Sequence, residues 1–233
     1  PISIYNRTLV ANFEAISYTI TANANPTEGG SVSGAGSYTY GQTATLTATA
    51  NTGYHFVNWT DGNAAVSSDA TYSFTVNGNR NLIANFQLNT YTISASANPV
   101  AGGTINGAGD YTHGQTVTLT ATASTGYNFV NWTENGTAIS TNATYSFTAT
   151  DNRTLVANFE AITYTISANA NPVEGGTITG AGDYTYGQNV TLNAVANAGY
   201  TFVNWTENRT EVSTNAEYTF TATKKRDLVA NFR

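Results

Sequence analysis

An eight-residue stretch that occurs three times constrains the fold of this chain more than any other feature. It reads Gly-Tyr-Xaa-Phe-Val-Asn-Trp-Thr and spans residues 53–60, 126–133 and 199–206. The copies begin 73 residues apart and contain all 3 tryptophans of the chain. A tyrosine, a phenylalanine, a valine and a tryptophan so close together supply much of the apolar area that a small unit can bury. Each copy is therefore predicted to form the centre of one repeating module's core.

A second recurring string, of the type Leu-Val-Ala-Asn-Phe, sets the boundaries of the repeats. Its last residue recurs every 73 positions, at Phe13, Phe86, Phe159 and Phe232. Four copies of this string accompany only three copies of everything else, so the first is expected to be the tail strand of a preceding repeat. The predicted organisation is a tail strand in residues 1–16 and full repeats at 17–88, 89–161 and 162–233. We expect residues 8–13 to be ordered only by a partner strand, because a lone strand is unstable in water.

Within a repeat, apolar and polar residues alternate with the period of half-buried strands. In the second copy the alternation is strict over residues 91–97 and 117–123, and glycines mark the turns between them. Four residues of the second stretch are expected to face the core: Val117, Leu119, Ala121 and Ala123. No segment has the apolar spacing of an amphipathic helix, and Thr, Asn, Ser and Gly are poor helix formers. The predicted class is all-β, with five or six short strands in each module.

The spacing from Phe129 to Trp132 is three residues, which does not suit a regular strand. In such a strand these two side chains would point to opposite faces of the sheet. A β-bulge between them would bring both into the core, and this is the predicted arrangement.

Composition excludes several classes of function. Charged residues make up 9% of the chain, the net charge is −6 and Lys and Arg together number 8, so clustered phosphate contacts to nucleic acid are not expected. The absence of Cys excludes disulfides, a thiolate nucleophile and a cysteine zinc site. No apolar run approaches the roughly 18 residues that span a membrane, so membrane insertion of this segment is not expected. Because the chain has no Met, it is expected to be a piece of a longer protein.

The sequence predicts no catalytic, cofactor or metal site, and hence no enzyme. The only histidines, His55 and His113, occupy different positions in their repeats and are interpreted as single surface residues. The loops at residues 61–63 and 134–136 offer one carboxylate each, whereas calcium sites use several. Two recurring acid pairs lie in turn-like sequence, where such residues cap or solvate turns. They are Asp110 with Asp183, and Glu134 with Glu207, and their counterparts in the first copy are Ser37 and Asp61.

Aromatic pairs and threonine rows are the remaining candidates for a binding surface. The pairs are Tyr38 with Tyr40, Tyr111 with His113, and Tyr184 with Tyr186. One member of each pair is expected to pack inward, and the other could stack on a sugar ring. The threonines of residues 43–49 and 116–122 could form a flat ice- or sugar-binding face, but exposed β-branched residues on a strand explain them more simply.

These motifs together resemble the internalin B-type B repeat, in its divergent branch, also called the Listeria–Bacteroides repeat. In the second copy the matching residues are Tyr111, Gly114, Val117, Leu119, Ala121, Gly126, Tyr127, Phe129, Trp132, Leu155, Ala157 and Phe159. The resemblance implies a β-grasp-like module, found in tandem in secreted or surface-attached bacterial proteins. This sequence departs from the pattern because it lacks a good helix to fill the grasp, so a small β-sandwich or barrel is the alternative fold.

The function expected from these features is a non-enzymatic, extracellular repeat array that acts as a spacer or adhesive stalk of a bacterial surface or secreted protein. The alternative is a carbohydrate- or host-protein-binding module. The expected partners are the neighbouring repeats of the chain and, in the alternative, a surface glycan or a host protein.

Overall fold

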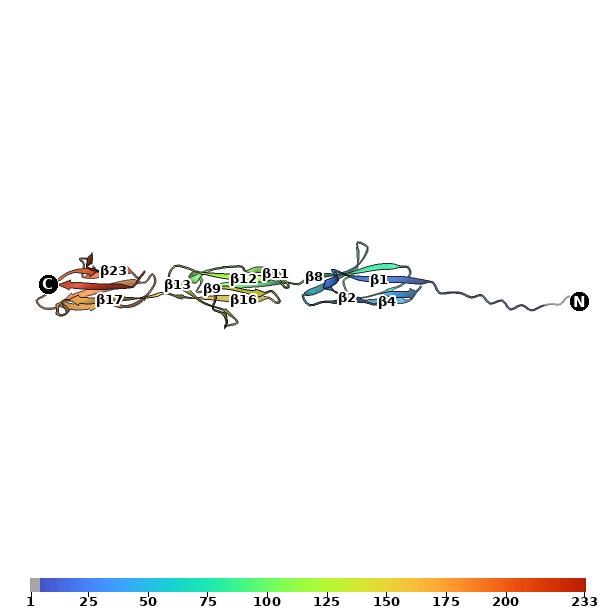
Figure 1. Ribbon diagram of the computed structural model, residues 1–233, viewed down its shortest axis with the longest axis horizontal. Coiled ribbons are helices and arrows are strands. Elements are labelled where there is room, and N and C mark those ends of the chain that lie inside the picture. Colours follow the sequence, from blue (N-terminus) through green and yellow to red (C-terminus); the bar gives the residue numbers. More distant parts are fainter. Residues whose placement is uncertain (1–4) are drawn as a thin grey trace. The chain divides into compact units, whose positions relative to one another are not determined.

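The regular structure of this protein is built of β-strands. A computed structural model describes residues 5–233, shown in Figure 1. No α-helix occurs in this range, and the only helical turns are 3-10 turns of three residues: Thr27–Gly29, Val100–Gly102 and Val173–Gly175. The chain divides into two compact units. One holds the residues up to Tyr91 with 110–115 and 148–151, and the other holds 92–109, 116–147 and 152–233. The all-β class predicted from the sequence is confirmed.

The first repeat contains eight strands. They are β1 (Ser17–Asn25), β2 (Gly30–Ser33), β3 (Gly36–Thr39), β4 (Thr43–Ala50), β5 (Tyr54–Asp61), β6 (Ala64–Ser67), β7 (Thr71–Thr75) and β8 (Arg80–Leu88). Five of them form a sheet in the order β3-β1-β8-β5-β6, and the other three form a sheet in the order β2-β4-β7. The central pair β1 and β8 is parallel, and the other pairs are antiparallel.

The second and third repeats have the same strand orders. The strands of the second are β9 (Thr90–Asn98), β10 (Gly103–Asn106), β11 (Gly109–Thr112), β12 (Thr116–Ala123), β13 (Tyr127–Glu134), β14 (Thr137–Ser140), β15 (Thr144–Thr148) and β16 (Arg153–Ala161). Those of the third are β17 (Thr163–Asn171), β18 (Gly176–Thr179), β19 (Gly182–Thr185), β20 (Asn189–Ala196), β21 (Phe202–Glu207), β22 (Thr210–Ser213), β23 (Glu217–Thr221) and β24 (Arg226–Phe232).

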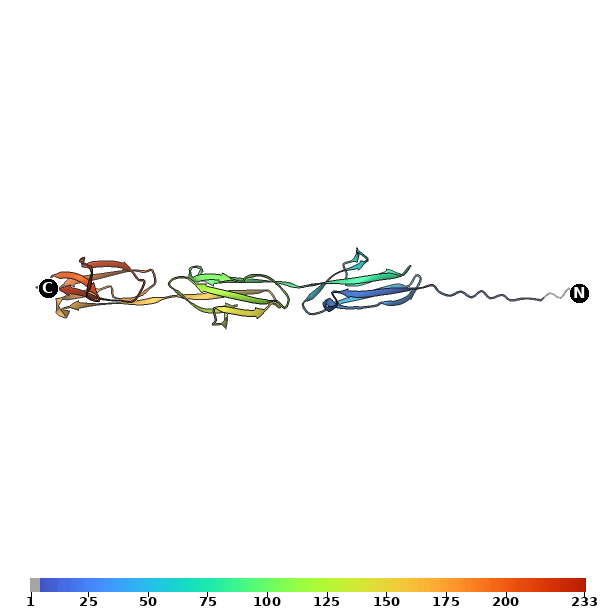
Figure 2. The ribbon, with the colours of Figure 1, turned by 45° about the horizontal axis from the view of Figure 1, so that its top comes forward.

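The two sheets of the first repeat pack face to face around one core, and Figure 2 shows these layers from another side. The alternating pattern of β4 buries Ala44, Leu46 and Ala48 from one sheet, and the other sheet contributes Trp59 and Leu82. The third repeat buries the equivalent residues. Two packed layers are the small β-sandwich arrangement that the sequence analysis left as the alternative, and the β-grasp description stays a prediction.

The predicted bulge is confirmed in the central stretch. On β13 the register against β16 shifts between Phe129 and Asn131, so Val130 is the extra residue. The shift places both aromatic rings on the inner face, with centroids of Phe129 and Trp132 6.0 Å apart. The other two repeats have the same shift at the same place.

One inward residue was predicted wrongly, and the tail segment forms no strand by itself, as its expected dependence on a partner strand allows. Ala123 is exposed, because it lies at the end of β12 opposite Gly103, which has no side chain to cover it. Residues 5–16 contain no strand, and Leu9 and Phe13 are exposed. The origin of this segment as the tail of a preceding repeat stays a prediction, and residues 1–4 of the predicted tail lie outside the described residues.

Candidate functional site

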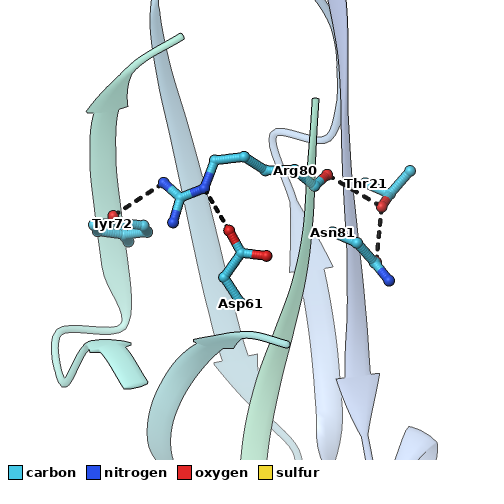
Figure 3. Close-up of polar contacts among 5 residues, drawn as sticks. All are labelled: Thr21, Asp61, Tyr72, Arg80 and Asn81. Atoms are coloured by element: carbon cyan, nitrogen blue, oxygen red, sulfur yellow. Dashed lines mark hydrogen bonds and ion pairs between the residues drawn. The ribbon is translucent and has the colours of Figure 1, made fainter. Parts of the chain in front are cut away.

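An arginine at the start of each repeat's last strand is the centre of a cluster of polar and aromatic side chains (Figure 3). In the first repeat, Arg80 of β8 donates through Nε to Oδ2 of Asp61, at the end of β5, over 2.7 Å. Its Nη1 donates to the hydroxyl of Tyr72 on β7 over 3.2 Å. The guanidinium carbon also lies 4.4 Å from the ring centroid of Phe74. Because β7 belongs to the other sheet, this arginine cluster ties the two layers together.

The second and third repeats repeat the arginine cluster with glutamate in place of aspartate. Arg153 donates through Nε and Nη2 to both carboxylate oxygens of Glu134, and its shortest contact is 2.6 Å. Arg226 donates through the same two nitrogens to one oxygen of Glu207. The longer glutamate side chain thus reaches a second guanidinium nitrogen, which the aspartate of the first repeat does not. Paired contacts of this kind fix the orientation of the planar guanidinium.

Hydrogen bonds within the cluster favour the charged form of Glu134 and of the three arginines. The hydrogen bonds from Arg153 hold the pKa of Glu134 below its usual value, against the opposing effect of burial. The hydrogen bond to Glu134 in turn raises the pKa of Arg153. Burial alone would lower the pKa of Arg80 and Arg226, but hydrogen bonds to their carboxylate and tyrosine partners leave it raised. A paired, permanently charged arginine is suited to holding strands in place and is a poor proton donor or acceptor.

Sequence reasoning missed the arginine cluster, although the sequence carries a signal for it. Arg80, Arg153 and Arg226 recur every 73 residues, each 19 positions after the acid that it binds. The acids were instead interpreted as turn residues. The other recurring acid Asp183 accepts a hydrogen bond from Thr165 over 2.7 Å. In the described part of the chain we find neither a pocket nor a group of metal-binding side chains.

A ladder of asparagine side chains crosses the outward face of each five-stranded sheet. In the second repeat, Asn98 of β9 donates to Asn158 of β16 over 3.2 Å. Asn158 donates in turn to Asn131 and Thr133 of β13, over 2.8 and 3.1 Å. The first and third repeats carry the same ladder, with Asn85 and Asn231 at its centre. This asparagine ladder presents amide groups on three neighbouring strands of each repeat.

Both histidines lie beside Asn89, and the first aromatic pair has one inward and one exposed member. His55 and His113, interpreted from the sequence as single surface residues, both bind Asn89: a ring nitrogen of His55 lies 2.9 Å from its side-chain oxygen, and the backbone N–H of His113 donates to its carbonyl. Tyr38 packs on the core and donates to the Gly34 carbonyl, as expected for the inward member of its pair. Tyr40 is 66% exposed.

The threonine rows lie on the outer faces of the three-stranded sheets, where part of each row is paired across strands. Thr45 bonds Ser73 over 2.8 Å, and Thr118 bonds Ser146 over 2.9 Å. These contacts fit the simpler explanation that the rows stabilise the sheet through cross-strand pairs.

Comparison with known families decides what kind of repeat this is. The family described as the divergent InlB B-repeat domain matches residues 18–90, 92–163 and 164–233. The chain belongs to this family. Its three B-repeats coincide with the three groups of strands in the structure. No helix in the described range is long and apolar enough to cross a membrane.

The B-repeats of this chain also resemble a solved structure at low identity. The structure titled "The Bacillus anthracis TIE protein" matches with 12% identity and a TM-score of 0.47, over 92% of this chain and 49% of that chain. This chain thus spans about half the length of that protein. No curated protein matches the sequence.

Proposed function

We propose that this chain is a non-enzymatic array of B-repeats that acts as a spacer or stalk in a secreted or surface-attached bacterial protein. The observation that carries the proposal is that the first and third repeats build complete cores of their own from equivalent residues. Low charge and the absence of cysteine, together with membership of the B-repeat family, support an extracellular location. A spacer needs modules that fold alike and can be added or removed without disturbing their neighbours.

Removal of one period tests the spacer directly. Deletion of residues 90–162 joins Asn89 to Thr163 and keeps one natural link between two complete repeats. We expect the remaining repeats to melt as they do in the full chain, and the maximum dimension from small-angle scattering to fall by about 30–40 Å, the size of a domain of this length. A deletion that unfolds the remaining repeats, or leaves the maximum dimension unchanged, contradicts the proposal.

A second candidate function is adhesion to a glycan or a host protein. The asparagine ladder favours it, because each repeat presents the same amide groups on an outward sheet face. Amide groups bind sugar hydroxyls both as donors and as acceptors. A glycan array distinguishes the two functions when it is probed with the full chain and with a variant in which the first asparagine of every ladder, Asn25, Asn98 and Asn171, is changed to alanine. Binding that the variant loses supports adhesion, and the absence of binding by the full chain favours the spacer.

A further inference from the structure

The link between the first and second repeats is held by backbone hydrogen bonds on both sides. Within the first compact unit, the N–H of Asn89 donates to the carbonyl of Gly53, and the N–H of His113 donates to the carbonyl of Asn89, both over 2.8 Å. Gly53 is buried, and a Cβ atom placed on it would lie 2.1 Å from Cδ2 of His113. The glycine turn of one repeat therefore packs directly against the aromatic ring of the next.

The link between the second and third repeats has the same geometry with other side chains. Within the second compact unit, Ile162 donates to the carbonyl of Gly126 and Tyr186 donates to the carbonyl of Ile162, again over 2.8 Å. A Cβ atom on Gly126 would lie 2.1 Å from Cδ1 of Tyr186. These two examples define a junction with three parts. The closing strand is the last strand of a repeat, β8 or β16, and the link residue is the residue that follows it, Asn89 or Ile162. The third part is the aromatic ring of the next repeat, which packs on the glycine turn.

The N-terminal segment has half of this junction. Residues 6–16 are identical to residues 152–162, which comprise β16 and its link residue. The N–H of Tyr40 donates to the carbonyl of Ile16 over 2.9 Å, which matches the bonds of His113 and Tyr186 to their link residues. Yet Phe13 is 94% exposed, whereas its counterpart Phe159 is 6% exposed. Leu9, 91% exposed, contrasts in the same way with a fully buried Leu155.

We propose that residues 6–16 and Tyr40 form a docking surface for a further repeat body of this type, carried before Asn6 on the same polypeptide. A repeat body is a repeat without its closing strand, such as residues 90–151. Residues 8–13 would enter the five-stranded sheet of that body as its closing strand, with Leu9 and Phe13 in the core. Arg7 would bind the carboxylate of the body, as Arg153 binds Glu134. Tyr40 would cover the glycine turn of the body.

Chemistry and connectivity favour this partner over a second copy of the chain. The closing strand lies between two neighbours, one parallel and one antiparallel, so its partner must offer both edges at once. Each of the three repeats already has its own closing strand in that place, β8, β16 or β24. A second copy would have to displace one of them, whereas a body on the same polypeptide benefits from a high effective concentration. The proposal does not depend on whether the array acts as a spacer or an adhesin.

A fusion of the chain to one of its own repeat bodies tests the proposal. Residues 163–224 are placed directly before Asn6, in place of residues 1–5, so that the added body is followed by a closing sequence that differs from its own. We expect amide exchange of residues 9–13 to slow by at least about 100-fold relative to the unmodified chain, as for a core strand. A fourth tryptophan indole signal, dispersed like the other three, should appear in the NMR spectrum at monomer mass.

Two variants of the fusion separate the strand from the aromatic contact. Leu9→Asp with Phe13→Ser should leave the added body unfolded and the other three indole signals unchanged. Tyr40→Ala should retain the fold of the added body but speed exchange at residues 14–16 by about 10-fold, since the link loses its aromatic cover. Unprotected residues 9–13 in the parent fusion would overturn the proposal. A Tyr40→Ala variant that exchanges like its parent would overturn the role of the ring. Protection that appears only when the fusion dimerises would instead identify a second copy as the partner.

Discussion

The cores of the three repeats are built from equivalent residues, whereas the two links between repeats differ in their side chains. In the core, Trp59, Trp132 and Trp205 are all 0% exposed, and each donates its indole N–H to an alanine carbonyl over 3.2 Å. In the links the backbone bonds are the same, but the link residue is Asn89 in one and Ile162 in the other. A close-packed core leaves no freedom of shape. A link, in contrast, depends on backbone hydrogen bonds and on a glycine, so the side chain of the link residue can vary.

Truncation of a core tryptophan should have the largest effect. Trp132→Ala is expected to cost about 3–5 kcal/mol, the usual range for a buried large aromatic side chain. A unit of 73 residues has about 4–11 kcal/mol in total, so the loss removes between about a quarter and all of this stability, and the second repeat should unfold before its neighbours. The indole NMR signals of Trp59 and Trp205 report on the neighbours and should persist. Loss of all three signals would show that the repeats fold as one unit, and unchanged melting would show that the core tolerates the cavity.

A substitution at the junction glycine should have the next largest effect, and the chain offers a matched control. Gly126 and Gly199 have nearly the same φ, +85° and +84°, but no described atom lies within 4 Å of a Cβ placed on Gly199. Both Gly→Ala changes suffer the same left-handed backbone strain, about 1–2 kcal/mol. Gly126→Ala must also displace the ring of Tyr186, for about 1–3 kcal/mol more. Urea denaturation of the two variants measures the difference, and equal losses would mean that the ring contact does not stabilise the junction.

The contrast between core and link also explains what the sequence could reveal. Alternation and the recurring Trp132 stretch predicted the class, the repeats, the bulge and most of the core, because burial on one face of a strand leaves a period of two in the sequence. Two features escaped. Glu134 and Arg153 are 19 residues apart and meet only through strand pairing. The packing of Tyr186 on Gly126, while Tyr40 is exposed, depends on the neighbouring repeat, which no local pattern records.

Loss of the arginine from its cluster should have a smaller effect than either of these changes. Arg153→Leu removes the tie between the sheets and leaves Glu134 without its partner. We expect a loss of about 1–3 kcal/mol, between the values for exposed and for fully buried ion pairs, because both side chains remain partly solvated. Lys225→Ala breaks an exposed pair with Asp227 at 3.9 Å and should change stability by less than about 0.5 kcal/mol. Equal losses in the two variants would mean that the cluster acts like any surface pair.

The smallest expected effect is a dependence of the second repeat's stability on acid pH. The bonds from Arg153 lower the pKa of Glu134 from its usual 4.5, so folding favours the ionised carboxylate. The contribution of this ionised carboxylate to the stability of the fold is fully present above pH 4.5. It is lost as the pH falls through the lowered pKa of Glu134. Glu134→Gln should therefore lower stability at pH 7, and this loss of stability should become smaller as the pH falls below 4.5. Urea midpoints, followed at the Trp132 indole, should converge between the variant and the parent as the pH falls. A gap that stays constant across this range would mean that Glu134 contributes through packing and not through its charge.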